Sequence, residues 1–178
     1  MKKLEAEIQM KKNFIFIIGK TLSGGNISID ASISSQFISA LLLVAPRLKN
    51  GLQLTLKGKT VSMPYIEMTV QLMQQFGAEV KWIENVISVA NRNYSGKNFL
   101  VEADWSAASY FYAIAILAEE AEIELQGLSD QAIQGDSVIA TTAADFGVET
   151  KWIGNCVHLK KNHAPAFSRY AFDFIECP

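Results

Sequence analysis

The sequence predicts an α/β protein built from repeated β-α-β-α-β-β units of about 70 residues. The first observation is an internal repeat, because "FGAEVKWIENVISV" begins at Phe76 and "FGVETKWIGNCVHL" begins at Phe146. Nine of these fourteen positions match or nearly match, and a fainter copy, "LEAEIQ", begins at Leu4. The second observation is that both copies follow the same alternation of short apolar strands and apolar helices.

The elements of each unit follow from apolar periodicity and turn residues. In chain order they are helices over 37–46 and 106–119, strands over 52–57 and 122–126, helices over 64–76 and 134–146, and hairpins over 78–90 and 148–160. The segments before the first helices align with Asp30 opposite Asp104 and Phe37 opposite Phe111. Pro64 fits the first position of its helix, where its missing N–H is not needed.

The two ends of the chain are interpreted as parts of further units. Residues 4–19 are typical of a closing hairpin, and "RYAFDFIECP", with Asp173 between Phe172 and Phe174, is typical of a first strand. We therefore expect repeat units truncated at both ends, as in a piece of a longer protein.

The composition indicates a globular protein with no nucleic-acid or membrane partner. The chain has 178 residues, of which 49% are hydrophobic and 19% charged, and its formal net charge is −2. No basic run interleaves with aromatic residues, and no apolar stretch approaches the ~20 residues of a membrane span. Two cysteines, Cys156 and Cys177, behind an N-terminus without a secretory signal favour a cytoplasmic location.

A cluster of small polar residues precedes the first predicted helix. In "DASISSQFISALLLVAP", Ser34, Ser35 and Gln36 stand directly before an apolar run. A serine hydroxyl is a favoured helix cap, and the free N–H groups of a helix start also bind anions. Both interpretations fit these residues, and the local sequence alone favours the cap.

Four segments resemble the 5-enolpyruvylshikimate-3-phosphate synthase family (3-phosphoshikimate 1-carboxyvinyltransferases): "ASISSQFISALLLVAP", "KTVSMPYIEMTVQLMQQFG", "VEADWSAASYF" and "QGD". The resemblance implies an inside-out α/β barrel, with three β-α-β-α-β-β units in each of two domains. It implies transfer of the enolpyruvyl group of phosphoenolpyruvate to the 5-hydroxyl of shikimate 3-phosphate, a step toward chorismate and the aromatic amino acids. It implies no cofactor.

The same resemblance implies a substrate-binding role for five residues. Ser34 and Ser35 would bind the 3-phosphate of shikimate 3-phosphate, and Gln36 would contact substrate near the enolpyruvyl group. Ser62, in "VSMPYI", is similar to a further phosphate-binding serine, and Tyr65 to the aromatic residue near the shikimate ring. Elementary chemistry agrees, because several short donors at a helix start bind a dianionic phosphate well.

The resemblance also divides the chain at "VEADWSAAS". Residues 1–100 would belong to the shikimate-phosphate-binding domain and residues 101–178 to the second domain. The general acid/base and the cations that hold phosphoenolpyruvate would lie outside this stretch, so no catalytic residue is assigned. We expect the chain alone to be inactive, and to self-associate through sheet edges left unpaired by truncation.

Two other functions stay open at this point. The sister enolpyruvyl transferase that acts on UDP-N-acetylglucosamine shares the fold, but we expect it to lack this Ser-Ser-Gln and Ser-x-Pro-Tyr pair. A non-catalytic module, whose repeats only bind an anion or a partner, is an alternative of another class.

The other polar candidates have structural interpretations. Asp104, Asp136 and Asp173 recur near strand ends or helix starts and are predicted to cap helices. His158 and His163 lack metal-ligand spacing with Cys156, and a closed zinc site needs four organised ligands, so no metal site is predicted.

Overall fold

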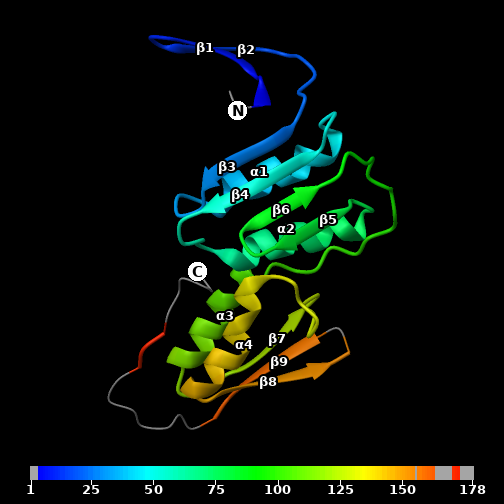
Figure 1. Cartoon of the computed structure of the whole chain (residues 1–178). Coiled ribbons are helices and arrows are strands. Elements are labelled where there is room, and N and C mark those ends of the chain that lie inside the picture. The colour runs from blue at the N-terminus through cyan, green and yellow to red at the C-terminus, as the bar shows by residue number, and fades with distance from the viewer. Residues whose placement is uncertain (1–3, 155, 163–169, 173–178) are drawn as a thin grey trace. The chain divides into compact units, whose positions relative to one another are not determined.

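The computed structural model describes residues 4–154, 156–162 and 170–172. The chain forms two compact units, Met1–Lys97 and Asn98–Pro178, which we name unit 1 and unit 2 (Figure 1). Each unit combines a β-sheet with helices, as the repeat predicts. Among the described residues, no helix has the length and apolar character needed to cross a bilayer.

Unit 1 contains a four-stranded sheet with two helices on one face (Figure 1). Its elements are β3 (Gly25–Asp30), α1 (Ser35–Val44), the short 3-10 helix η2 (Ala45–Arg47), β4 (Leu52–Lys57), α2 (Met63–Gln75), β5 (Val80–Ile83) and β6 (Val86–Val89). The strand order is β3-β4-β6-β5, in which β3 and β4 are parallel and the other pairs antiparallel. Because β3 and β4 are parallel, both strands deliver the chain to the same edge of the sheet before each helix begins.

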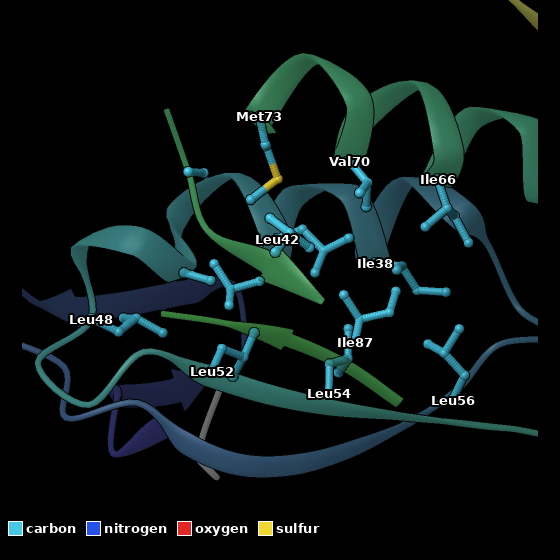
Figure 2. Packing of buried hydrophobic residues seen from close by; sticks show 14 of the residues in the cluster. Ile38, Leu42, Leu48, Leu52, Leu54, Leu56, Ile66, Val70, Met73 and Ile87 are labelled. Carbon is cyan, nitrogen blue, oxygen red and sulfur yellow. The ribbon is translucent and has the colours of Figure 1, made fainter. Parts of the chain in front are cut away.

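The core of unit 1 lies between this sheet and its two helices. Alternate β4 side chains, those of Leu52, Leu54 and Leu56, are buried, as the period-2 pattern predicts. Figure 2 shows these leucines and Ile87 of β6 facing a layer of helical side chains. That layer consists of Ile38 and Leu42 from α1 and Ile66, Val70 and Met73 from α2.

Unit 2 repeats the order around a three-stranded antiparallel sheet, β7-β9-β8. Its elements are α3 (Trp105–Leu117), β7 (Glu122–Gln126), η3 (Gly135–Val138), α4 (Ile139–Thr142), η4 (Ala143–Phe146), β8 (Val148–Ile153) and β9 (Cys156–Lys161). Its buried core consists of Trp105, Ala108, Tyr112, Ala115, Leu128, Ala143, Val148, Val157 and Leu159. The strands predicted over 52–57 and 122–126 are both present with those bounds.

The second helix of unit 2 is broken, so the continuous helix predicted over 134–146 is wrong. One α-helical turn, α4, lies between the 3-10 helices η3 and η4. The hydroxyls of Thr141 and Thr142 donate to the Val138 carbonyl, at 2.8 and 3.1 Å. Such side-chain bonds compete with helix formation, and β-branched residues also lose rotamer freedom in a helix.

The two helical segments are in register at an offset of 70 residues, which corrects the pairing of Asp30 with Asp104. Ser34 caps α1 and Asp104 caps α3, so these two residues correspond. The buried positions agree with this register: Ser35, Ile38 and Leu42 in α1, and Trp105, Ala108 and Tyr112 in α3. Phe37 therefore corresponds to Ala107 and not to Phe111.

The segments that lead into α1 and α3 show why the first alignment was wrong. The Ala31 N–H donates to the Lys57 carbonyl, and the Ala103 N–H donates to the Gly127 carbonyl, both at 2.8 Å. These equivalent bonds place Asp30 opposite Glu102. Ser34 follows Ala31 by three residues and Asp104 follows Ala103 by one, so the loop before α1 is longer by two residues.

The hairpin predicted over 4–19 is present as a separate two-stranded sheet of β1 (Glu7–Lys11) and β2 (Phe14–Ile18). Leu4, directly before it, is buried in the unit 1 core. The β2 side chains are exposed, with Phe14 at 69% and Ile17 at 72%. The strand expected around Asp173 lies outside the described residues.

Candidate anion-binding site

The five predicted site residues lie where β3 and β4 end and α1 and α2 begin. Ser34, Ser35 and Gln36 form the start of α1, while Ser62 and Tyr65 belong to the start of α2. The backbone N–H of Val61 donates to the Ala31 carbonyl at 3.3 Å, which joins the loops before the two helices. The structure thus brings together two serine-bearing segments that are almost 30 residues apart in the sequence.

Ser34 caps α1, as predicted. Its backbone is extended, with φ −169° and ψ 131°, and its Oγ accepts from the Gln36 N–H at 3.2 Å. A capping serine uses its oxygen as acceptor and keeps its hydroxyl proton for another partner. The cap and anion interpretations of Ser34 are therefore compatible.

Ser35 occupies the first helical position and is only 7% exposed. Within the described parts of the chain, no protein group is recorded as a hydrogen-bond partner of its hydroxyl, and no fully buried side-chain oxygen or nitrogen lacks a partner. The Ser35 hydroxyl therefore keeps access to solvent although most of the residue is buried. A ligand oxygen at this helix start would replace that solvent.

Ser62 has the left-handed backbone conformation, with φ 54° and ψ 45°, and its side chain makes no capping bond. Non-glycine residues adopt this conformation rarely, and such strain is concentrated at functional sites. Its carbonyl accepts from the Tyr65 N–H at 3.2 Å. Met63 is the first residue of α2, so Pro64 lies at the second helical position and not at the predicted first.

Gln36 and Tyr65 extend the site beyond the serines. The Gln36 side chain is exposed at the first turn of α1, and Tyr65 is half-buried in the first turn of α2. Gln36 thus lies within one turn of Ser34 and Ser35 on α1, and Tyr65 lies within one turn of Ser62 on α2.

A bond between the helices holds the two starts together, and sequence reasoning missed it. Thr69 is 8% exposed, its Oγ1 lies 2.9 Å from Ser39 Oγ, and it donates to the Tyr65 carbonyl at 2.8 Å. The repeat carries the signal that could have found it, because Ile139 occupies the position of Thr69 in unit 2. A buried threonine where the other copy has an apolar residue indicates a local hydrogen bond.

The corresponding position of unit 2 has the opposite chemistry. Asp104, Trp105 and Ala132 stand where unit 1 has Ser34, Ser35 and Ser62. The Asp104 carboxylate accepts from the Ser106 N–H at 2.9 Å, and Trp105 is fully buried. A carboxylate cap repels an anion, and an indole ring fills the space, so this helix start is not an anion site.

The Glu102 carboxylate holds this part of unit 2. It accepts from Trp105 Nε1 at 2.8 Å, from the Ser129 N–H at 2.9 Å and from Gln134 Nε2 at 3.1 Å. Asp136 lies inside η3 and the residue before that element is Gln134, so the predicted capping role of Asp136 is wrong. The capping role of Asp104 is confirmed.

Other features of the described residues do not enlarge the site. A hollow of about 290 Å³ opens at the amino end of β3 and β4, lined by Gly25, Asn50 and Glu79 among others, and contains none of the five candidates. Across the described ranges, no three His, Cys, Asp or Glu side chains are placed to hold a metal ion.

Comparisons with known proteins decide the family. The family model described as EPSP synthase (3-phosphoshikimate 1-carboxyvinyltransferase) matches residues 1–167. The chain belongs to the EPSP synthase family. A 3-phosphoshikimate 1-carboxyvinyltransferase of Bacteroides fragilis is 44% identical over 183 residues, covering 100% of this chain and 44% of that protein. One of Vibrio campbellii is 39% identical over 139 residues, covering 76% of this chain and 32% of its own length.

The fold of this EPSP synthase family member is also found in solved structures. An EPSP synthase from Acinetobacter baumannii superposes with a TM-score of 0.60 at 22% sequence identity, covering 89% of this chain and 36% of that one. The predicted α/β fold of the enolpyruvyl transferases is therefore confirmed. The chain spans less than half the length of these relatives.

Proposed function

We propose that the chain forms part of a 3-phosphoshikimate 1-carboxyvinyltransferase and that unit 1 binds the phosphate of shikimate 3-phosphate. The observation that carries this proposal is the meeting of two serine-bearing helix starts at one sheet edge, linked by the Val61–Ala31 hydrogen bond. Membership of the EPSP synthase family supports the choice of substrate. The corresponding helix start in unit 2 has Asp104 and the buried Trp105 in place of serines. The fold therefore forms this helix start without serines, which favours a ligand-binding role for the serines of unit 1.

Each residue has a distinct proposed role. The hydroxyls of Ser34 and Ser35, with the N–H groups of the first turn of α1, donate to the phosphate oxygens. The Ser62 hydroxyl donates from the start of α2. Gln36 contacts substrate near the enolpyruvyl group, and Tyr65 packs near the shikimate ring.

The proposed reaction transfers the enolpyruvyl group of phosphoenolpyruvate to the 5-hydroxyl of shikimate 3-phosphate and releases phosphate. In this proposal residues 1–100 belong to the shikimate-phosphate-binding domain and residues 101–178 to the second domain. The five site residues carry no positive charge, and enolpyruvyl transfer needs cations and a general acid/base at the reacting atoms. We therefore expect no turnover from the 178-residue chain alone, and we expect the protein to be cytoplasmic.

Calorimetric titration with shikimate 3-phosphate tests the proposal. We expect saturable binding to the wild-type chain and its loss in Ser35→Ala, because that variant removes a hydroxyl donor at the helix start. Ser106→Ala, an exposed serine in the first turn of α3, is the matched control and should bind like the wild type. Binding that Ser35→Ala retains in full would contradict the assignment, and measurable turnover by the pure chain would contradict the predicted inactivity.

We further propose self-association of this chain through β2. Its sheet has only β1 as a described partner, so the outer edge of an apolar strand is left unpaired. A second copy can pair antiparallel with the same edge. Light scattering should show a dimer or larger species, and Ile17→Lys should return the chain to a monomer.

A further inference from the structure

The loop before α1 is longer than the loop before α3, and the two additional residues are Ser32 and Ile33. Ile33 is 68% exposed, so this side chain gives the loop little anchoring. Longer loops lose more conformational entropy when they are ordered. A loop that must present serines in one geometry therefore needs another restraint.

The Asp30 carboxylate supplies such a restraint. Its Oδ1 accepts from the Ser32 N–H at 2.9 Å and from Ser32 Oγ at 2.6 Å. A Cβ at position 58 would lie 3.5 Å from the same oxygen, so the carboxylate also lies near Gly58, in the turn after β4. Asp30 thus bonds to the loop before α1 and lies near the segment that leads to Ser62. The Ser32 hydroxyl, followed by the Ser32 N–H, lowers the pKa of Asp30.

The negative charge of Asp30 argues against direct phosphate binding by this residue. A carboxylate near a phosphate site repels the ligand, and an uncharged residue there would bind phosphate more favourably. Glu102, at the corresponding position in the segment before α3, also bonds to a neighbouring loop through the Ser129 N–H. Both units therefore use the acidic residue at this position to fix a loop.

We infer that Asp30 is a positioning residue for phosphate binding. By bonding to Ser32, Asp30 fixes the loop of residues 31–34 so that Ser34 and Ser35 present their hydroxyls to the anion. This inference rests on the proposed function. Asp30 itself does not touch the ligand, and its negative charge opposes binding.

Two substitutions at Asp30 separate positioning from charge. Asp30→Asn keeps an oxygen that can accept both Ser32 bonds and removes the charge, whereas Asp30→Ala removes both. Asp104→Ala, which removes a helix cap in unit 2, is the control for a general loss of stability. Each full-length variant is titrated with shikimate 3-phosphate by calorimetry, and amide hydrogen exchange of Ser32 and Gln36 is measured without ligand.

If Asp30 positions the loop, Asp30→Ala and Asp30→Asn should change the affinity for shikimate 3-phosphate in different directions. Asp30→Ala should weaken binding by about tenfold or more, since an ordered donor group is released. Asp30→Asn should bind at least as tightly as the wild type, and Asp104→Ala should bind like the wild type. Equal losses in Asp30→Asn and Asp30→Ala, or no loss in Asp30→Ala, would overturn the inference.

The exchange measurement keeps this inference separate from the proposed function. Ser32 and Gln36 amides should exchange faster in Asp30→Ala and at the wild-type rate in Asp30→Asn, whether or not ligand binds. If the wild-type chain binds no shikimate 3-phosphate, the proposed function fails for this chain. The exchange rates alone then test whether Asp30 orders the loop of residues 31–34. Unchanged exchange in Asp30→Ala would then overturn the positioning role.

Discussion

Ser35 in unit 1 and Trp105 in unit 2 occupy the same position of the repeat, the first residue of the first helix in each unit. Both are buried, but the serine leaves a hydroxyl at the helix start while the indole packs into the core. The Trp105 ring lies 6.3 Å from Tyr112 and 5.9 Å from Trp152, centroid to centroid. In the proposed function, one position of a shared fold thus serves ligand binding in unit 1, while in unit 2 it contributes to the core.

A second pair of positions differs in chemistry while keeping its role. Asn91 Nδ2 donates to the Pro46 carbonyl at 3.2 Å and to the Leu48 carbonyl at 2.8 Å. Lys161, 70 residues later, donates to the Ile116 carbonyl at 2.8 Å and to the Phe146 carbonyl at 2.9 Å. Asn91 satisfies carbonyls just after α1, whereas Lys161 satisfies one carbonyl in the last turn of α3 and one at the end of η4. Carbonyls at helix ends lack intrahelical partners and need such donors. The two units therefore share a side-chain donor at positions 91 and 161, whereas they differ in chemistry at positions 35 and 105.

The largest difference between the units should follow from truncating Ser35 in unit 1 and Trp105 in unit 2. Trp105→Ala should lower the free energy of unfolding of unit 2 by about 3–5 kcal/mol, because it leaves a large cavity. Ser35→Ala should change the stability of unit 1 by less than about 0.5 kcal/mol. Hydrogen exchange resolved by residue measures both units in one sample. A large loss of stability in Ser35→Ala would show that the serine is structural and would break the comparison.

Substitution of Asn91 or Lys161 should change the free energy of unfolding less than substitution of Trp105. Lys161→Met should destabilise unit 2 by about 2 kcal/mol, since two charge-assisted bonds are lost. Asn91→Ala should destabilise unit 1 by about 1 kcal/mol, since its bonds are neutral. Urea denaturation checks both values, and Lys160→Met, which removes the neighbouring exposed lysine of β9, is the control. Equal effects of the three substitutions would show that these donors do not matter to the helix ends.

The smallest effect should be the pH dependence that Glu124 gives to unit 2. Hydrogen bonds from Gln126 and then Cys156, followed by the His158 charge, lower the pKa of Glu124 from its usual value of 4.5. A lowered pKa in the folded state stabilises the fold above the unfolded value, and this contribution is lost as the pH falls through the folded value. Unit 2 should therefore lose stability below pH 4.5, and Glu124→Gln should make the loss shallower. An identical acid profile for the variant would show that Glu124 is not responsible.

The comparison also shows how far sequence reasoning reached. The repeat predicted the strands over 52–57 and 122–126 and the hairpins, because apolar alternation and turn residues are local signals. It failed for the helix over 134–146, where threonine hydroxyls bond to the backbone and break the helix. The pairing of Asp30 with Asp104 failed because an alignment by residue type cannot see a loop that is two residues longer.

For the candidate site, the sequence predicted which residues belong and left out how they are held. Ser34 and Ser62 were predicted from motifs, but the strained backbone of Ser62 depends on tertiary contacts that no local pattern encodes. The Thr69–Ser39 bond was missed for the same reason, since it joins residues 30 positions apart. Long-range restraints of this kind become visible only when both loops are placed on the sheet.

Amide chemical shifts during titration with shikimate 3-phosphate test the central claim most directly, because one spectrum reports on both helix starts. The account predicts large shifts for the amides of Ser35, Gln36 and Tyr65, and none for Trp105 and Ser106 in unit 2. Shifts centred on the start of α3, or an unchanged spectrum of the folded chain at saturating ligand, would contradict it.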